Sequence, residues 1–253
     1  MVRSSRTLLW PPVAFSLSAE QVRHAYARVR ASLIADSLFI QDAARYGVTV
    51  DELDRRMRQP PDRLDSKASW DWLDGPDQYR WAALRVLVEA YPPADRHELS
   101  GRIVVPGDAI HVVAADVRVD GDLVLEEQAV LFVLGKLQVT GALVGRPGYS
   151  VAAGREIECA NGATAGDVLV LDGIRCLGAF YFGDNDYSAR AASYDGGVLV
   201  DFERENAFGR VDVRKRVTDW DFPAAARALG LPDDEDDLLD AYTAKLLGEQ
   251  NGT

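Results

Sequence analysis

The sequence predicts an α+β fold, in which a central short β-solenoid has helical caps at both ends. Two observations support this class. Residues 101–217 alternate apolar and polar side chains with recurring glycines, the period-two pattern of strands. The flanking residues carry the spacing of amphipathic helices. We therefore expect an N-terminal helical cap region (1–100), a β-repeat domain (101–217) and a C-terminal helical cap (218–253).

The N-terminal region contains start and stop signals for three helices. Ser18 and Gln21 have the spacing of a capping box, and Gly47 is a plausible end of that helix. Thr49 can cap a second helix, with Glu52 three residues later. A third helix is expected through "PDQYRWAALRVLVEAY".

The β-repeat domain contains similar segments that begin at Ile103, Val117 and Leu131, each 14 residues after the last. Another copy begins at Leu137, six residues after the third. The recurring glycine indicates a bend or tight packing of the backbone. Short strands with regular glycine corners favour a stacked solenoid. An antiparallel β-meander or sandwich is the alternative. His111 is expected to point inward.

The last part of the chain returns to helical patterns. Asp219 is expected to cap a helix that ends at Gly230, and Pro232 to lie in the first turn of another, beside the acids of 233–236. Before them, the alternation in "RVDVRKR" (210–216) predicts a strand with one charged face. Helical regions on both sides of the repeat would cover the unpaired strand edges at the ends of the coil.

At "VDGDLVL" and "VLGKLQVTGALVG" the chain resembles bacterial proteins rich in V-x-G-x-L β-repeats. Some of these are bactofilin-like polymer-forming proteins, and others are immunity proteins encoded beside polymorphic toxins. The resemblance covers roughly residues 101–180. The Gly-Asp-Leu triplet of the group stands at 121–123, whereas 135–137 and 141–143 depart from it. The resemblance implies a solenoid and, as functions, toxin neutralisation or polymer formation.

Composition narrows the classes of partner. The 253 residues carry a net charge of −12, which argues against a nucleic-acid or membrane partner and suits a basic protein partner. Cys159 and Cys176 fit a reduced, cytoplasmic protein and match no zinc pattern. Pro11 and Pro12 interrupt the apolar run near the start, which weighs against a signal peptide.

No constellation of residues indicates catalysis, a metal or a cofactor. The candidate partner-binding loop is "DNDYSARAASYD", which contributes Asp184, Asp186, Tyr187, Tyr194 and Asp195. Tyrosines supply contact area and carboxylates steer a basic partner. A calcium loop is not expected there, because the match to its ligand spacing fails at the sharp turn and at the last ligand.

A second candidate patch is "SWDWLDGPDQYRW", which contains Trp70 and Trp72 among aspartates. It is either packed under the helical cap, as expected for Trp81, or exposed as a binding surface.

These features together predict a non-enzymatic cytoplasmic binding protein, first of all an immunity protein that neutralises a cognate toxin by occlusion. A polymer-forming scaffold is the alternative, and a carbohydrate-binding or carbohydrate-active solenoid is the second. Because helical caps would cover the coil edges, we expect a monomer or dimer.

Overall fold

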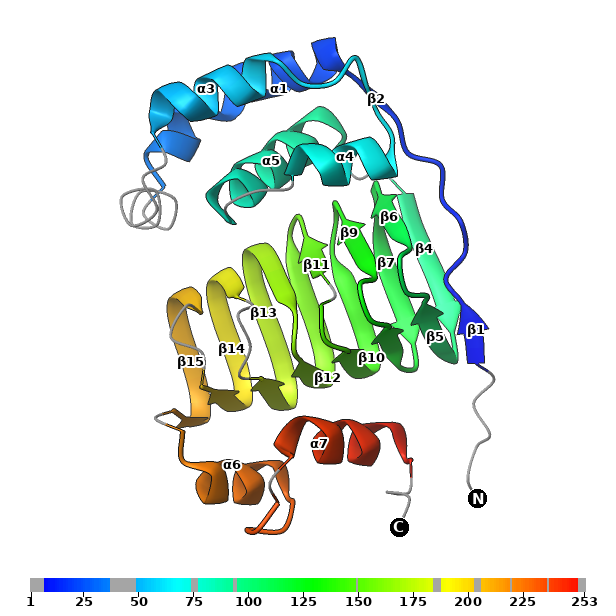
Figure 1. The fold of residues 1–253 in the computed structure, drawn as a ribbon, viewed down its shortest axis with the longest axis vertical. Helices are drawn as coiled ribbons and strands as arrows, with labels where there is room; N and C mark the ends of the chain where they lie inside the picture. Colours follow the sequence, from blue (N-terminus) through cyan, green and yellow to red (C-terminus); the bar gives the residue numbers. More distant parts are fainter. Residues whose placement is uncertain are drawn as a thin grey trace.

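The computed structural model confirms the α+β fold, with a central parallel β-solenoid of about six turns and helical segments beside it (Figure 1). The alternative of an antiparallel meander is excluded, because the strands of the coil pair in parallel. The residues that the structure describes are 7–36, 49–73, 77–92, 95–148, 150–183, 188–202, 206–218, 220–235 and 237–249.

The described helices are α1 (Ala19–Ile34), α3 (Val50–Arg58), α4 (Ser66–Leu73), α5 (Asp77–Ala90), α6 (Phe222–Leu229) and α7 (Leu238–Leu247). The predicted capping box of Ser18 and Gln21 is present, and Thr49 caps α3. In the described part of the chain, no helix combines the length and apolarity that a membrane span needs.

The start positions predicted for the last two helices are wrong. Asp221 rather than Asp219 caps α6, because its carboxylate accepts the Ala224 N–H at 3.0 Å. Asp237 caps α7 in the same way through the N–H of Asp240, so Pro232 and the acids after it precede the helix.

The solenoid strands are β4 (Asp95–Ser100), β5 (Arg102–Val105), β6 (Ile110–Val113), β7 (Ala115–Asp120), β8 (Leu123–Leu125), β9 (Val130–Val133), β10 (Leu137–Gly145), β11 (Ser150–Ala153), β12 (Glu156–Thr164), β13 (Asp167–Phe182), β14 (Ala189–Asp201) and β15 (Ala207–Val217). β1 (Thr7–Leu9) joins this sheet beside β5. β2 (Leu17–Ser18) and β3 (Arg63–Leu64) form a separate antiparallel pair.

Successive coils stack with an offset of about 20 residues, not 14. Leu137 lies beside Val117, and Ile174 beside Tyr194. The segments at Ile103, Val117 and Leu131, predicted to be equivalent, instead lie on three different sides of the coil, in β5, β7 and β9. The 14- and six-residue offsets of the sequence together make one coil.

Inward-facing side chains from all three sides fill the coil with a continuous apolar core. His111 shares this inward phase, since it lies beside the fully buried Leu131. It is half-buried in the first coil, with its ring centroid 6.3 Å from that of Trp10.

Two of the three sides of the coil are covered by helices. The side formed by β6, β9, β11 and the first part of β13 packs against α4 and α5, with α1 and α3 outside them. The side formed by β5, β8 and the last parts of β10, β12, β13 and β14 packs against α6 and α7. The helices therefore lie along the flanks of the coil (Figure 1), whereas the sequence analysis placed them over its ends.

The third side is made by β4, β7, the first parts of β10 and β12, and the middle parts of β13, β14 and β15. None of the described apolar clusters that join helices to the coil includes an outward residue of this side. We call its first six strands, from β4 to β14, the bare face.

Candidate interaction surface

The outward side chains of the bare face form two charged rows across six coils. Strand alternation sends one set of residues into the core and the next set outward. The outward residues of the first six strands of this side are Arg96, Glu98, Asp116, Arg118, Lys136, Gln138, Glu156, Glu158, Arg175 and Asp195. The rows therefore hold five carboxylates and four cations.

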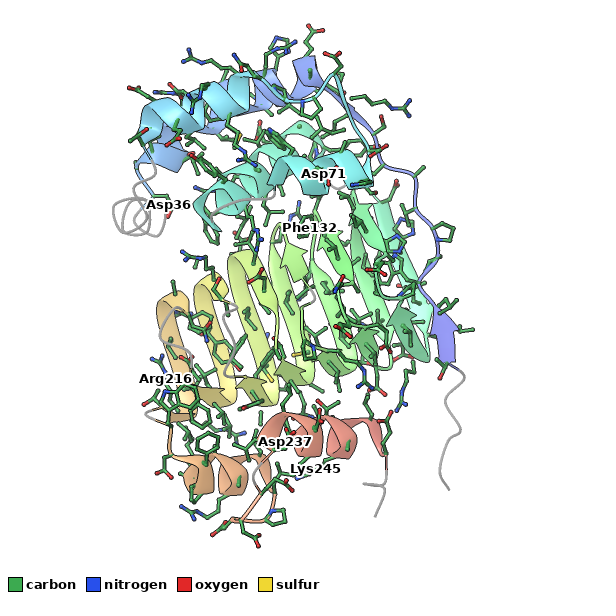
Figure 2. All side chains as sticks on the ribbon, viewed as in Figure 1. Asp36, Asp71, Phe132, Arg216, Asp237 and Lys245 are labelled. Atoms are coloured by element: carbon green, nitrogen blue, oxygen red, sulfur yellow. The ribbon has the colours of Figure 1, made fainter. Side chains whose placement is uncertain are left out.

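Hydrogen bonds between coils fix the centre of this surface. Arg118 Nη1 donates to Gln138 Oε1 at 3.1 Å, and Gln138 Nε2 donates to Glu158 Oε1 at 3.0 Å. Lys136 Nζ lies 2.6 Å from Glu158 Oε2 and 2.8 Å from Glu156 Oε2. Each link joins neighbouring strands of the stack, so the network is a ladder of paired side chains. Figure 2 draws the described side chains on the ribbon, in the view of Figure 1.

Electrostatics favour the charged forms of Lys136 and Glu158. The hydrogen bond from Lys136 lowers the pKa of Glu158. Partial burial alone would lower the pKa of Lys136, but its hydrogen bonds to Glu156 and Glu158 raise it instead. A fixed network of ionised groups loses little side-chain freedom when a partner binds, which favours affinity and specificity.

A hollow of about 120 Å³ lies at the N-terminal part of the bare face, between Arg96, Arg118, Lys136 and Gln138. Pockets for small molecules usually enclose about 300 to 1,000 Å³. This hollow is thus smaller than the usual pocket for a small molecule.

The predicted acidic-tyrosine loop is shorter than expected, and its residues separate. Asp184, Asp186 and Tyr187 lie outside the described residues. Tyr194 and Asp195 lie within β14, where alternation points them in opposite directions. Tyr194 is completely buried between the rings of Phe180, Phe182 and Phe208, so the prediction that it contacts a partner is wrong. Asp195 lies on the bare face, 2.8 Å from Arg210.

The described tryptophans of the second candidate patch are packed under the N-terminal helices and are not exposed. Trp72 is only 6% exposed and Trp81 3%, and both belong to the cluster that joins the N-terminal helices to the coil. Trp72 is therefore not a surface residue. The side chain of Trp70 lies outside the described part of the structure.

The interior of the coil contains a sulfur pair that the sequence analysis did not bring together. Cys159 and Cys176 are neighbours in successive coils, and both are buried. Hydrogen bonding to Cys176 and burial raise the pKa of the Cys159 thiol. Among the described residues, no three His, Cys, Asp or Glu side chains gather in a way that could hold a metal ion.

The bare face escaped the sequence analysis because its residues meet only at an offset of about 20. Asp116, Lys136 and Glu156 follow one another at that interval, as do Arg118, Gln138 and Glu158. This interval of about 20 residues between charged or polar positions is the sequence feature that could have revealed the bare face. Comparisons with protein families, with curated proteins and with solved structures each found no match for this chain.

Proposed function

We propose that this chain is a non-enzymatic binding protein that covers the surface of a basic protein partner with its bare face, as an immunity protein covers a toxin. The observation that carries the proposal is the uncovered third side of the coil. Helices protect the two other sides, and here a preformed ladder of charged side chains meets the solvent.

The charge of the whole chain supports a basic partner. A net charge of −12 raises the local concentration of cationic proteins and speeds their encounter. The ladder then offers carboxylates and cations at fixed positions, which selects a partner with the complementary pattern and disfavours others. A rigid platform of stacked strands can occlude an active site without any chemistry of its own.

End-to-end polymer formation is the alternative function, and the N-terminal end of the coil weighs against it. Trp10, only 5% exposed, packs against the core at the first coil, and its backbone N–H donates to the Val104 carbonyl at 2.8 Å. β1 adds a further strand beside β5. Stacking another copy on this end would require the displacement of that segment.

The test compares two variants that change the net charge equally. Glu156→Lys with Asp195→Lys reverses two charges of the bare face. Asp51→Lys with Asp234→Lys reverses two exposed acids elsewhere. Each variant and the wild type are used to capture proteins from cells of the source organism, and the captured protein is then tested for association rate and for toxicity when expressed alone.

We expect one basic protein to bind the wild type and the control variant, and to associate with the bare-face variant about tenfold more slowly at low salt. Co-expression of the wild type should relieve its toxicity, and co-expression of the bare-face variant should not. Equal capture by all three proteins would remove the bare face from the interface. A captured partner that is harmless when expressed alone would contradict the immunity role.

A further inference from the structure

The C-terminal end of the solenoid has an open strand edge. β15 pairs with β14 on one side, and no described strand pairs with its other side. A strand edge of this kind presents unpaired backbone N–H and C=O groups to any extended chain that approaches. In Figure 1, β15 forms the end of the row of strands opposite to β1 and β4.

The part of β15 that continues the bare face combines apolar and basic side chains. Val211 and Val213 point toward the core but are only partly buried, because no further coil covers them. Arg210 and Arg214 are exposed. Together with the exposed Lys215 and Arg216, and against Asp212, they give this strand a charge of +3 in a chain of −12.

Two of these cations already have partners. Arg210 Nη2 lies 2.8 Å from Asp195 Oδ1, and Arg216 Nη2 lies 2.6 Å from Asp201 Oδ2. The exposed positions of Arg214 and Lys215 leave their charge available to an approaching chain. The edge therefore attracts carboxylates, in contrast to the basic partner proposed for the bare face.

A second copy of this chain does not fit the edge as a continuation of the coil. Continuation of the ladder would bring β4 of that copy beside β15, in the same phase as its own neighbour β7. Arg210 would then face Arg96, and Asp212 would face Glu98. Like charges directly opposite each other on neighbouring strands destabilise the pair.

We propose that β15 binds an extended acidic segment of a partner protein as an added strand beside Arg210–Arg214. The segment has acids opposite Arg210 and Arg214, apolar residues opposite Val211 and Val213, and a neutral polar residue between them. Main-chain hydrogen bonds supply affinity and the alternating side chains supply specificity, as in other cases of strand addition. This site is separate from the bare-face function proposed above and does not depend on it.

The probe is a fluorescent peptide, Thr-Thr-Glu-Val-Thr-Val-Glu-Thr-Thr, whose palindromic pattern presents the same side chains in either strand direction. Its binding is followed by fluorescence anisotropy at low and at high salt. The edge variant is Arg214→Glu with Lys215→Glu. The control is Arg23→Glu with Lys67→Glu, an equal charge change at exposed positions on α1 and α4. Circular dichroism checks that both variants fold.

We expect the edge variant to bind the peptide at least about tenfold more weakly than the wild type, and the control variant to bind as the wild type does. Hydrogen exchange of the backbone amides of 210–213 should slow when the peptide binds. Retention of peptide binding by a variant with Glu98→Lys and Glu156→Lys, two bare-face positions away from β15, would separate this site from the bare face.

Three results would each overturn the proposal. The first is no binding of the peptide to the wild type. The second is binding without slower amide exchange in β15, which would mean a charge contact and no added strand. The third is a dimer, seen by light scattering, that protects the β15 amides without peptide, which would make a second copy the occupant.

Discussion

Replacement of Gly162 by alanine tests how the coils interlock. Gly162 lies in β12 at an inward position between Leu143 of the preceding coil and Phe180 of the following one. A Cβ at this position would come within 2.7 Å of three ring carbons of Phe180. The ring cannot swing away freely, because it stacks on Phe182 at 4.4 Å and meets the edge of Tyr194 at 6.4 Å.

The expected cost follows from this collision. Overpacking of a well-filled core lowers the free energy of unfolding by about 1 to 3 kcal/mol, and we expect Gly162→Ala to fall in that range. Phe180→Leu removes part of a buried ring and should cost about 1 to 2 kcal/mol. In the double variant the shorter leucine leaves room for the added methyl group. The decrease in the free energy of unfolding of the double variant should therefore be smaller than the sum of the two single decreases by about 1 kcal/mol or more.

Urea denaturation followed by circular dichroism measures all four proteins of this cycle. A single transition with an unchanged slope justifies comparison of the unfolding free energies. Additive losses, within about 0.5 kcal/mol, would show that the Phe180 ring is not what excludes a side chain at Gly162.

Three further predictions concern the end of the coil, a partly buried carboxylate and the sulfur pair. Trp10→Ala should lower the free energy of unfolding by about 3 to 5 kcal/mol in urea denaturation, and a loss below about 1 kcal/mol would mean that Trp10 does not seal the core. A hydrogen bond from Arg30 lowers the pKa of Asp54 to about 2. The folded pKa thus lies below the ordinary value of about 4, so the stabilisation is present above that pH and is lost as the pH falls toward 2. Asp54→Asn should therefore reduce the fall of the unfolding free energy between about pH 4 and pH 2. An unchanged fall would contradict a stabilising role of the ionised Asp54. Cys159 and Cys176 should react with a thiol reagent only after denaturation, and fast labelling of the native protein would contradict their burial.

The sequence predicted the coil but not its stacking, for a physical reason. Each side of a coil requires the same alternation of apolar residues and a tight corner, so the three sides resemble one another. Self-comparison therefore matched Ile103, Val117 and Leu131, which share a type of position and never stack. Which residues stack depends on the number of residues in one complete coil. The corners differ in length, so this number cannot be read from the local alternation of side chains.

The interaction surface was harder to predict than the fold. Alternation shows which residues point outward, but not whether a helix later in the chain covers them. Val144 and Glu158 both lie outward, yet Val144 is buried near α7 while Glu158 belongs to the bare face. The sequence favours a loop over "SARAASYD", whereas β14 begins at Ala189. Small residues there leave room for the aromatic rings inside the coil.

Arg216 explains why the open end of the solenoid accepts a short segment and not another coil. It stands beside Leu199, which stands beside Phe180, in a column that is apolar in those earlier coils. In the last coil this position carries a charge, paired with the buried carboxylate of Asp201. A further complete coil would bury this ion pair, and the loss of its hydration can exceed its Coulombic gain.

An inward-pointing charge of this kind protects a sheet edge against continuation. The protection is limited to the side that packs on α6 and α7, since Val211 and Val213 remain apolar on the other side. The end of the coil therefore admits a strand only along the few residues from Arg210 to Arg214.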